Sequence, residues 1–458
     1  MDFALTSQQS VGGRIASNSG LLFGSKAFGA ALGFVTLVLA AANLAPVELA
    51  TVVFLHGYML FFSEVMTFQP WQAVIRFGSD DVAVSDERGF ARLLNFCFRL
   101  DALSSVLAFA ASVLLFGAVT ALLEAFPGIW PGTDQIDPST LFGYVLAYNT
   151  VMLSQQNGVA IGALRLFDRF VSIAATSLVM PVLRLVGVLV AVQQGWGVVG
   201  YIAVWYVASL ARYLAILGAG LWELWRRDML APTVRAKVSF LQPREGLWAF
   251  ATKAYIDSSL AAGFSHLPLI LVMAFIGPAF VAVYKIAEEV ARLLSEGVKL
   301  LDQVIYPELA RIVAAGRGWQ MVRLVTRASL IALGVGVAMA ALVYVGGPLV
   351  IGYLLSDEYS RVVDVAVLLV IGAAIFAAVA PIYPVFYAVG RPERAIYARL
   401  AGIIAYAASF VWLTGWLGDI GSAWAWIVGY AIALVVVLWL VVRTLDGFQP
   451  KTLGEPAE

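Results

Sequence analysis

The sequence has little of what most catalytic and metal sites are built from. It contains one cysteine, Cys97, and two histidines, His56 and His266, in 458 residues. One cysteine excludes an internal disulfide and a thiolate metal cluster, and two histidines are too few for most metal or haem sites. We find no Walker phosphate loop and no nucleophile elbow. We therefore expect no catalytic residues, no metal, no cofactor and no enzyme activity.

Charge is equally scarce. Charged residues make up 13% of the chain, and 29 lysines and arginines balance 29 aspartates and glutamates, so no net field points to nucleic acid. The hydrophobic fraction is 61%, against about 45–50% in soluble domains. The composition predicts an all-α polytopic membrane protein. The stretch 1–19 is polar and lacks a basic region before a cleavage site, so we expect the first apolar segment to be retained.

Apolar segments long enough to cross a membrane, about 20 residues each, recur along the whole chain. We count twelve, at 20–43, 48–75, 94–120, 139–163, 170–193, 197–223, 248–276, 279–305, 325–353, 362–388, 394–417 and 421–443. The basic stretch between the sixth and seventh divides them equally. We therefore predict the following organisation: an N-terminal six-helix bundle, 1–224; a cytoplasmic linker, 225–247; a C-terminal six-helix bundle, 248–444; and a cytoplasmic tail, 445–458.

The distribution of lysine and arginine sets the orientation. With the N-terminus inside, the inner loops hold many basic residues, whereas the outer connections hold only Arg361. Cytoplasmic loops of membrane proteins carry this excess. We predict a multi-pass protein of a bacterial inner membrane with both termini in the cytoplasm. If 279–305 did not span, the later basic loops would all move outside, so this segment must span.

That segment carries a row of charges. Lys285, Glu289, Arg292, Glu296 and Lys299 are spaced four, three, four and three residues apart, and so share one face of a helix. A charge at mid-membrane costs at least ~2.5 kcal/mol on insertion scales, so five cannot face lipid. The alternative is an amphipathic helix at the membrane surface, which the orientation argument disfavours. We expect the row to face a polar central cavity.

The two halves resemble each other. Gly24–Phe28 in the first span matches Ala251–Tyr255 in the seventh, and each match contains a lysine, Lys26 or Lys253. We predict a parallel repeat about a pseudo-twofold axis along the membrane normal. Proline removes a helix hydrogen bond, which predicts kinks at Pro70, Pro181, Pro268, Pro381 and Pro384.

Charges inside the spans are the candidate site. The candidate substrate-binding residues are Lys26, Lys253, Lys285, Arg292 and Lys299, and the candidates for ion coupling or charge balance are Glu64, Asp257, Glu289 and Glu296. Excess positive charge suits an anion such as a pyrophosphate. The alternative is that opposite charges three and four residues apart only pair with each other. His56 and His266 are weaker candidates, because a lone helical histidine is more often a core residue.

Several short stretches carry a resemblance to a known family. They are Gly24–Phe28, Gln69–Arg76, Leu164–Phe170, Tyr306–Arg311 and Ala388–Arg391. With twelve spans in two halves, the chain resembles the polysaccharide transporters of the multidrug/oligosaccharidyl-lipid/polysaccharide exporter superfamily. The resemblance implies a flippase that moves an undecaprenyl-pyrophosphate-linked oligosaccharide to the outer leaflet by alternating access, for capsule, O-antigen or exopolysaccharide synthesis. It also implies membrane lipids and a polymerase of the same pathway as partners, and leaves H⁺ or Na⁺ open as the coupling ion.

Two other functions compete with this one. A cation-coupled multidrug exporter of the same superfamily should have an acid-dominated cavity, whereas the row of charges here is mixed and extra lysines accompany it. A membrane glycosyltransferase or polymerase should have a large outer loop with catalytic residues. The longest outer loop, 122–140, contains no lysine, arginine or histidine.

The orientation argument can be tested with reporter fusions. Fusions after Gly277 and after Gly316 should report opposite sides of the membrane, because 279–305 lies between them. Reports from the same side would remove the charged segment from the membrane.

Overall fold

The computed structural model describes residues 11–125, 136–240, 244–294, 318–355, 359–388 and 393–445. These residues form helices joined by short turns, with no strand among them. The chain divides into two compact units, Met1–Pro278 and Ala279–Glu458, called unit 1 and unit 2 below. The predicted all-α fold of long apolar helices is confirmed.

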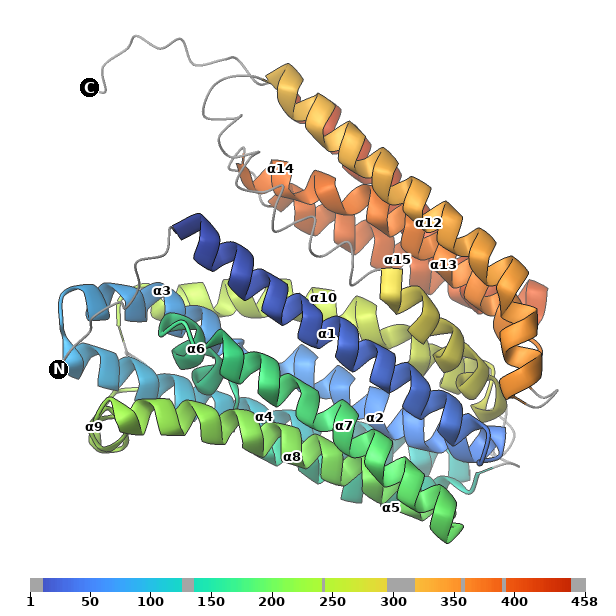
Figure 1. The fold of residues 1–458 in the computed structure, drawn as a ribbon, viewed down its shortest axis with the longest axis horizontal. Coiled ribbons are helices and arrows are strands. Elements are labelled where there is room, and N and C mark those ends of the chain that lie inside the picture. Colours follow the sequence, from blue (N-terminus) through green and yellow to red (C-terminus); the bar gives the residue numbers. More distant parts are fainter. Residues whose placement is uncertain are drawn as a thin grey trace. The chain divides into compact units, whose positions relative to one another are not determined.

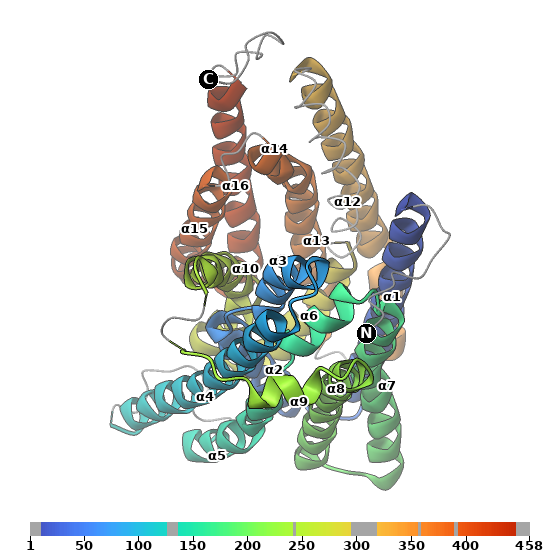
Figure 2. The same cartoon turned by 90° about the vertical axis from the view of Figure 1, so that its left-hand side faces the viewer.

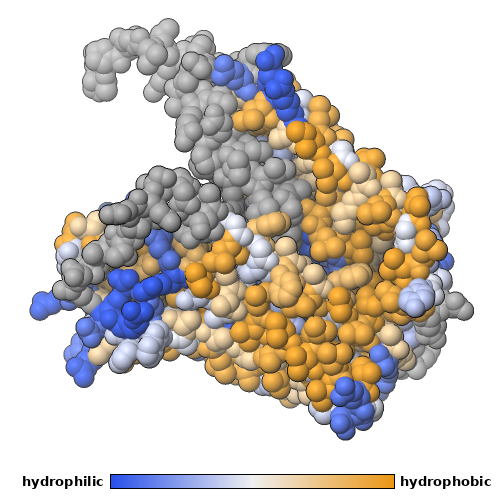
Figure 3. All heavy atoms as spheres, in the orientation of Figure 1, coloured by the Kyte–Doolittle hydropathy of each residue, from blue (hydrophilic) through white to orange (hydrophobic). Residues whose placement is uncertain are grey.

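Unit 1 contains most of the helices that Figure 1 labels. They are α1 (Val11–Ala41), α2 (Pro46–Met66), α3 (Pro70–Ala83), α4 (Glu87–Ala125), α5 (Pro138–Asn149), the 3₁₀ turn η1 (Thr150–Ser154), α6 (Gly158–Leu166), α7 (Phe170–Gln194), α8 (Val198–Arg226), α9 (Leu230–Arg235) and α10 (Leu247–Phe275). Helix α7 packs against α1 and α8, and α10 packs against α2. On the face seen in Figure 3, hydrophobic residues cover the middle of this unit and hydrophilic residues gather at its ends.

In unit 2 the helices pack around α13. Residues 279–294 are helical up to the end of that described stretch. After them come α12 (Gly318–Leu354), α13 (Val362–Val379), the turn η3 (Ala380–Ile382), α14 (Tyr383–Ala388), α15 (Glu393–Leu417), the turn η4 (Gly418–Ile420) and α16 (Gly421–Leu445). Helix α13 packs against both α12 and α16, and its Leu369 and Val370 are buried. Apart from Asp364 in its first turn, its residues are apolar, as is expected of a central helix.

Each predicted span is mostly helical where the structure describes it. Within the described ranges, eight helical stretches are long and apolar enough to cross a membrane, or nine if the bent α10 is one span. Helix α10 bends by 47° between Leu260 and Ser265, close to Pro268. Two predicted spans are interrupted by non-helical residues in their described parts: the second between α2 and α3, and the fourth between η1 and α6. Pro70 begins α3, and Gln69 before it has a left-handed backbone.

The predicted linker, 225–247, is fixed to unit 1. Thr233 accepts a hydrogen bond on its carbonyl from the buried Asn95 side chain at 2.9 Å. Arg244 pairs with Asp81 at 2.8 Å, and the Phe240 ring lies 5.4 Å from that of Phe96. The compact unit extends beyond the linker to Pro278 because α10 packs against α2. The predicted repeat of two six-helix halves stays a prediction.

Helices α6 and α8 approach so closely that one position between them accepts only glycine. A Cβ atom on Gly220 of α8 would lie 2.5 Å from the Ala160 Cα atom of α6. We predict that Gly220→Ala lowers the free energy of unfolding by about 1–3 kcal/mol, the usual cost of overpacking. Thermal unfolding of the purified protein in detergent measures the effect.

The matched control lies on the same helix. A Cβ on Gly218 would meet nothing within 4 Å, so Gly218→Ala should be neutral or slightly stabilising, because alanine favours helix over glycine. Equal melting temperatures for the two variants would contradict the close contact of α6 and α8.

Candidate functional site

The charged segment, 278–294, lies with its apolar faces buried. Val281, Tyr284 and Ile286 are at most 1% exposed, which is expected of a helix that packs inside a bundle. Glu296 and Lys299 fall outside the described residues. The charges that can be placed are Lys285, Glu288, Glu289 and Arg292.

These four charges pair with one another along the helix. The Lys285 ammonium lies 2.6 Å from Glu288 and 3.1 Å from Glu289. The Arg292 guanidinium lies 2.6 Å from the other oxygen of Glu289. Two cations and two carboxylates thus form a neutral ladder, with the i,i+3 and i,i+4 spacing on which helical ion pairs depend. The pairing alternative recognised in the sequence is therefore present, at least in this part of the row.

The ladder is unevenly buried. The side chain of Glu289 is 11% exposed and that of Lys285 is 23% exposed, whereas that of Arg292 is 46% exposed. Lys285 is enclosed and joins two carboxylates, so it holds the ladder together. The guanidinium of Arg292 has five N–H donors and a large accessible surface. Of the two cations, Arg292 is therefore the one that a ligand can reach.

The remaining predicted residues lie in unit 1. Lys26 on α1 and Lys253 on α10 are both exposed. Glu64 on α2 is 41% exposed and lies 3.1 Å from His266 of α10. The side chain of Asp257 lies outside the described part of the chain. The structure thus joins one predicted carboxylate to a histidine of the seventh span, which sequence spacing could not show.

A second polar group crosses the middle of unit 1. The Arg184 guanidinium of α7 lies 2.9 Å from His56 Nε2 of α2 and 3.2 Å from the Ser209 hydroxyl of α8. The other ring nitrogen of His56 lies 3.0 Å from the Tyr148 hydroxyl of α5, and Arg184 also stacks over Trp205 at 5.2 Å. His56 is thus held within the bundle, in agreement with the interpretation of a core histidine. A charge within an apolar span was visible in the sequence, but its partners on three other helices were not.

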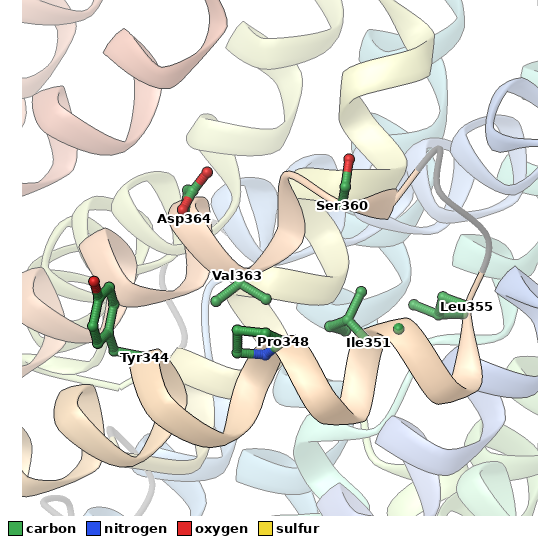
Figure 4. Close-up of a pocket in the computed structure, with 8 residues that line it drawn as sticks. Tyr344, Pro348, Ile351, Leu355, Ser360, Val363 and Asp364 are labelled. Carbon is green, nitrogen blue, oxygen red and sulfur yellow. The ribbon is translucent and has the colours of Figure 1, made fainter.

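Unit 2 contains a shallow hollow of about 460 Å³ between the end of α12 and the start of α13. Figure 4 shows its lining, which includes Tyr344, Pro348, Val363 and Asp364. None of the lining residues is basic, so this hollow does not match the predicted anion site. Among the described residues, no group of three or more histidine, cysteine, aspartate or glutamate side chains could hold a metal ion.

Comparison with solved structures defines the fold class. The fold is similar to that of solved membrane transporters. It superposes on a multidrug resistance MATE family transporter in an inward-facing conformation with a TM-score of 0.70 and 16% identity, covering 91% of this chain and 95% of that one. It superposes on the lipid II flippase MurJ in an inward closed conformation with a TM-score of 0.65 and 12% identity, covering 93% and 89%. At this identity, the likeness shows the fold.

The sequence is also similar to that of a particular protein, the inner membrane protein YghQ of Escherichia coli strain K12. The two are 26% identical over 338 residues, which are 73% of this chain and 91% of the relative. No protein-family model matches the chain. The comparisons therefore show a fold shared with a MATE transporter of the MOP superfamily and with MurJ, and the polysaccharide branch named by the resemblance stays a prediction.

The uneven burial of the ladder can be tested by stability. Lys285→Met removes the cation that Glu288 and Glu289 share, so we predict a loss of stability approaching the ~3–5 kcal/mol of a broken buried pair. Arg292→Met removes a half-exposed partner and should cost about 1 kcal/mol or less. Thermal unfolding in detergent measures both. A larger loss for Arg292→Met would contradict the assignment of Lys285 as the structural cation.

Proposed function

We propose that this protein is a flippase of a bacterial inner membrane. In this proposal it moves an undecaprenyl-pyrophosphate-linked oligosaccharide from the inner to the outer leaflet by alternating access, for the synthesis of a surface polysaccharide. Three findings support the proposal: the fold shared with MATE and MurJ transporters, the E. coli relative described as an inner membrane protein, and the described function of MurJ as a lipid II flippase.

The observation that carries the proposal is the accessible guanidinium of Arg292. Most of the described part of its helix is buried, although the neighbouring Leu293 is also exposed, and its described ionic partner, Glu289, is shared with Lys285. An anionic ligand can therefore bond to Arg292 without leaving Glu289 unpaired, because Lys285 still neutralises that carboxylate. Arginine suits a pyrophosphate because its planar fork can donate two parallel hydrogen bonds. In the proposal, Lys26, Lys253, Lys285 and Lys299 add positive charge for the pyrophosphate and sugar.

The proposed carboxylates have a different task. Glu289 and Glu296 keep the row of charges neutral when no substrate is bound, so that the empty carrier does not expose bare cations. Glu64 and Asp257, with these two, are the candidates for coupling to H⁺ or Na⁺. The further proposed partners are the membrane lipids and a polymerase of the same pathway, which would use the oligosaccharide once it reaches the outer leaflet.

One observation favours a second candidate, a cation-coupled multidrug exporter. The described part of the row of charges is neutral, with two cations and two carboxylates, so its excess positive charge depends on residues beyond 294. A cationic drug would bind the carboxylates and would not need Arg292. The two candidates therefore differ in which charge of the ladder is essential.

We predict that Arg292→Ala loses most of the export of the surface glycan while membrane abundance stays normal. A hydrogen bond to a charged group contributes about 1.5–3 kcal/mol, so the loss should be about ten- to hundredfold. Arg292→Lys should be partly active, because the charge remains but the fork is lost. The measurement is complementation of a flippase-deleted strain, with protein levels checked by blot.

The matched control is Arg76→Ala on α3. Arg76 is also exposed and also pairs along its helix, with Asp80 at 3.0 Å, but it is not a proposed site residue, so export should be unaffected. Full glycan export by a stable Arg292→Ala variant would contradict the flippase proposal. If the same strain also lost drug resistance on Glu289→Gln, the exporter would replace it.

A further inference from the structure

The two broken spans of unit 1 lie side by side. The first break is at residues 67–69, between α2 and α3. The second is at residues 155–157, between η1 and α6. Helices α3 and α6, which follow the breaks, pack against each other, as Figures 1 and 2 show. A Cβ on Gly158, the first residue of α6, would lie 2.4 Å from the ring of Pro70, the first residue of α3. Such non-helical backbone at membrane depth is tolerated where protein encloses it.

A carboxylate from a third helix closes the break in the fourth span. Asp101 of α4 accepts hydrogen bonds on Oδ2 from the backbone N–H groups of Gly158, at 2.7 Å, and Val159, at 3.3 Å. It thus caps α6 from outside the helix. Asn157 occupies the cap position itself, yet its side chain makes no capping bond. The usual work of a capping side chain is done here by a residue 57 positions away in the sequence.

This cap leaves two buried acceptors without donors. Asp101 is 1% exposed and Asn157 is 8% exposed. Within the described part of the chain, neither Asp101 Oδ1 nor Asn157 Oδ1 has a hydrogen-bond partner. Asn157 directly precedes Gly158, whose N–H group contacts the Asp101 carboxyl. Two orphan oxygens, one of them on a carboxyl group, thus lie at the same helix start.

No cation of the described residues neutralises Asp101 by an ion pair. The neighbouring elements carry several ionisable side chains, among them Cys97 and Arg99 on α4, Glu64 on α2, Arg76, Asp80 and Asp81 on α3, and Arg165 on α6. None of them contributes a hydrogen bond to the carboxyl group, whose partners are the two backbone N–H groups. An ionised carboxylate in such surroundings is costly, because burial removes water and no opposite charge replaces it.

We propose that Asp101 is a proton-binding site. Its Oδ1 atom carries the proton and donates a hydrogen bond to Asn157 Oδ1. This one hydrogen bond gives each of the two orphan oxygens a partner, with Asp101 Oδ1 as the donor and Asn157 Oδ1 as the acceptor. Protonation also removes the buried negative charge. Oδ2 continues to accept from Gly158 and Val159. The bound proton thus joins α4 to the broken fourth span by a third hydrogen bond. A metal ion would need a fuller shell of oxygen ligands than these two.

Infrared spectroscopy of the purified full-length protein tests the site directly. A protonated carboxyl group has a carbonyl stretching band that an ionised one lacks. We expect this band in the difference spectrum between wild type and Asp101→Asn at neutral pH. In Asn157→Leu, which has a similar volume and no acceptor, the Asp101 band should persist at a shifted frequency. The control is Asp81→Asn: Asp81 is also buried but is paired with Arg244, so the band should remain.

Stability supplies a second measurement. Asp101→Asn can still accept from Gly158 and can donate its N–H₂ group to Asn157, so it copies the protonated state at every pH. Protonated Asp101 stabilises the native state at low pH, and this contribution is lost as the pH rises. The melting temperature of Asp101→Asn should therefore rise relative to wild type as the pH increases.

Three results would overturn the proposal. The first is a difference spectrum between wild type and Asp101→Asn that lacks the protonated-carboxyl band and shows only carboxylate bands, which would mean that Asp101 is ionised and that the Asn157 amide donates to it. The second is loss of the Asp101 band when sodium replaces potassium at constant pH, which would make the ligand a metal ion. The third is a melting-temperature difference that does not change with pH.

Discussion

The constraint on which this structure depends is that lipid offers no hydrogen-bond partners. Each backbone N–H and C=O group and each charge within the spans must find its partner inside the protein. Unbroken helices meet the requirement by themselves. Breaks and charges do not, and both occur here: two spans are interrupted, and one buried helix carries a row of four charges. In both cases the hydrogen-bond or ionic partners are side chains from neighbouring helices or from the same helix.

Contacts within one helix and contacts between helices have different physical consequences. The ladder from Lys285 to Arg292 is local, because each pair is separated by three or four residues on one helix. It forms wherever that helix forms, and it is neutral in itself. The contacts of Arg184 with His56 and of Asp101 with Gly158 join helices that are distant in sequence. These contacts require the whole bundle, so they are the ones that a conformational change in unit 1 would have to break or carry along.

Sequence reasoning found the parts of the structure that follow from local physics. Hydropathy located the spans, Pro70 marked the start of α3, and helical spacing anticipated the pairing of Lys285 with Glu289. It did not find that α10 packs with the helices before it. That packing arises from contacts such as the stacking of Tyr255 on Phe68 at 4.5 Å, which have no periodic signal. The role of Asp101 was hidden for the same reason, since a cap from another helix has no motif at the helix that it caps.

The presence of a single cysteine in the sequence has a practical consequence. Cys97 is fully buried and lies one helical turn before Asp101, in the core that α3, α4 and α6 share with the linker. Because the chain has no other thiol, the natural protein already carries a single chemical probe at its interior. Alkylation of that thiol by a water-soluble reagent would measure how often the core opens, without any engineered label and without a background from other sites.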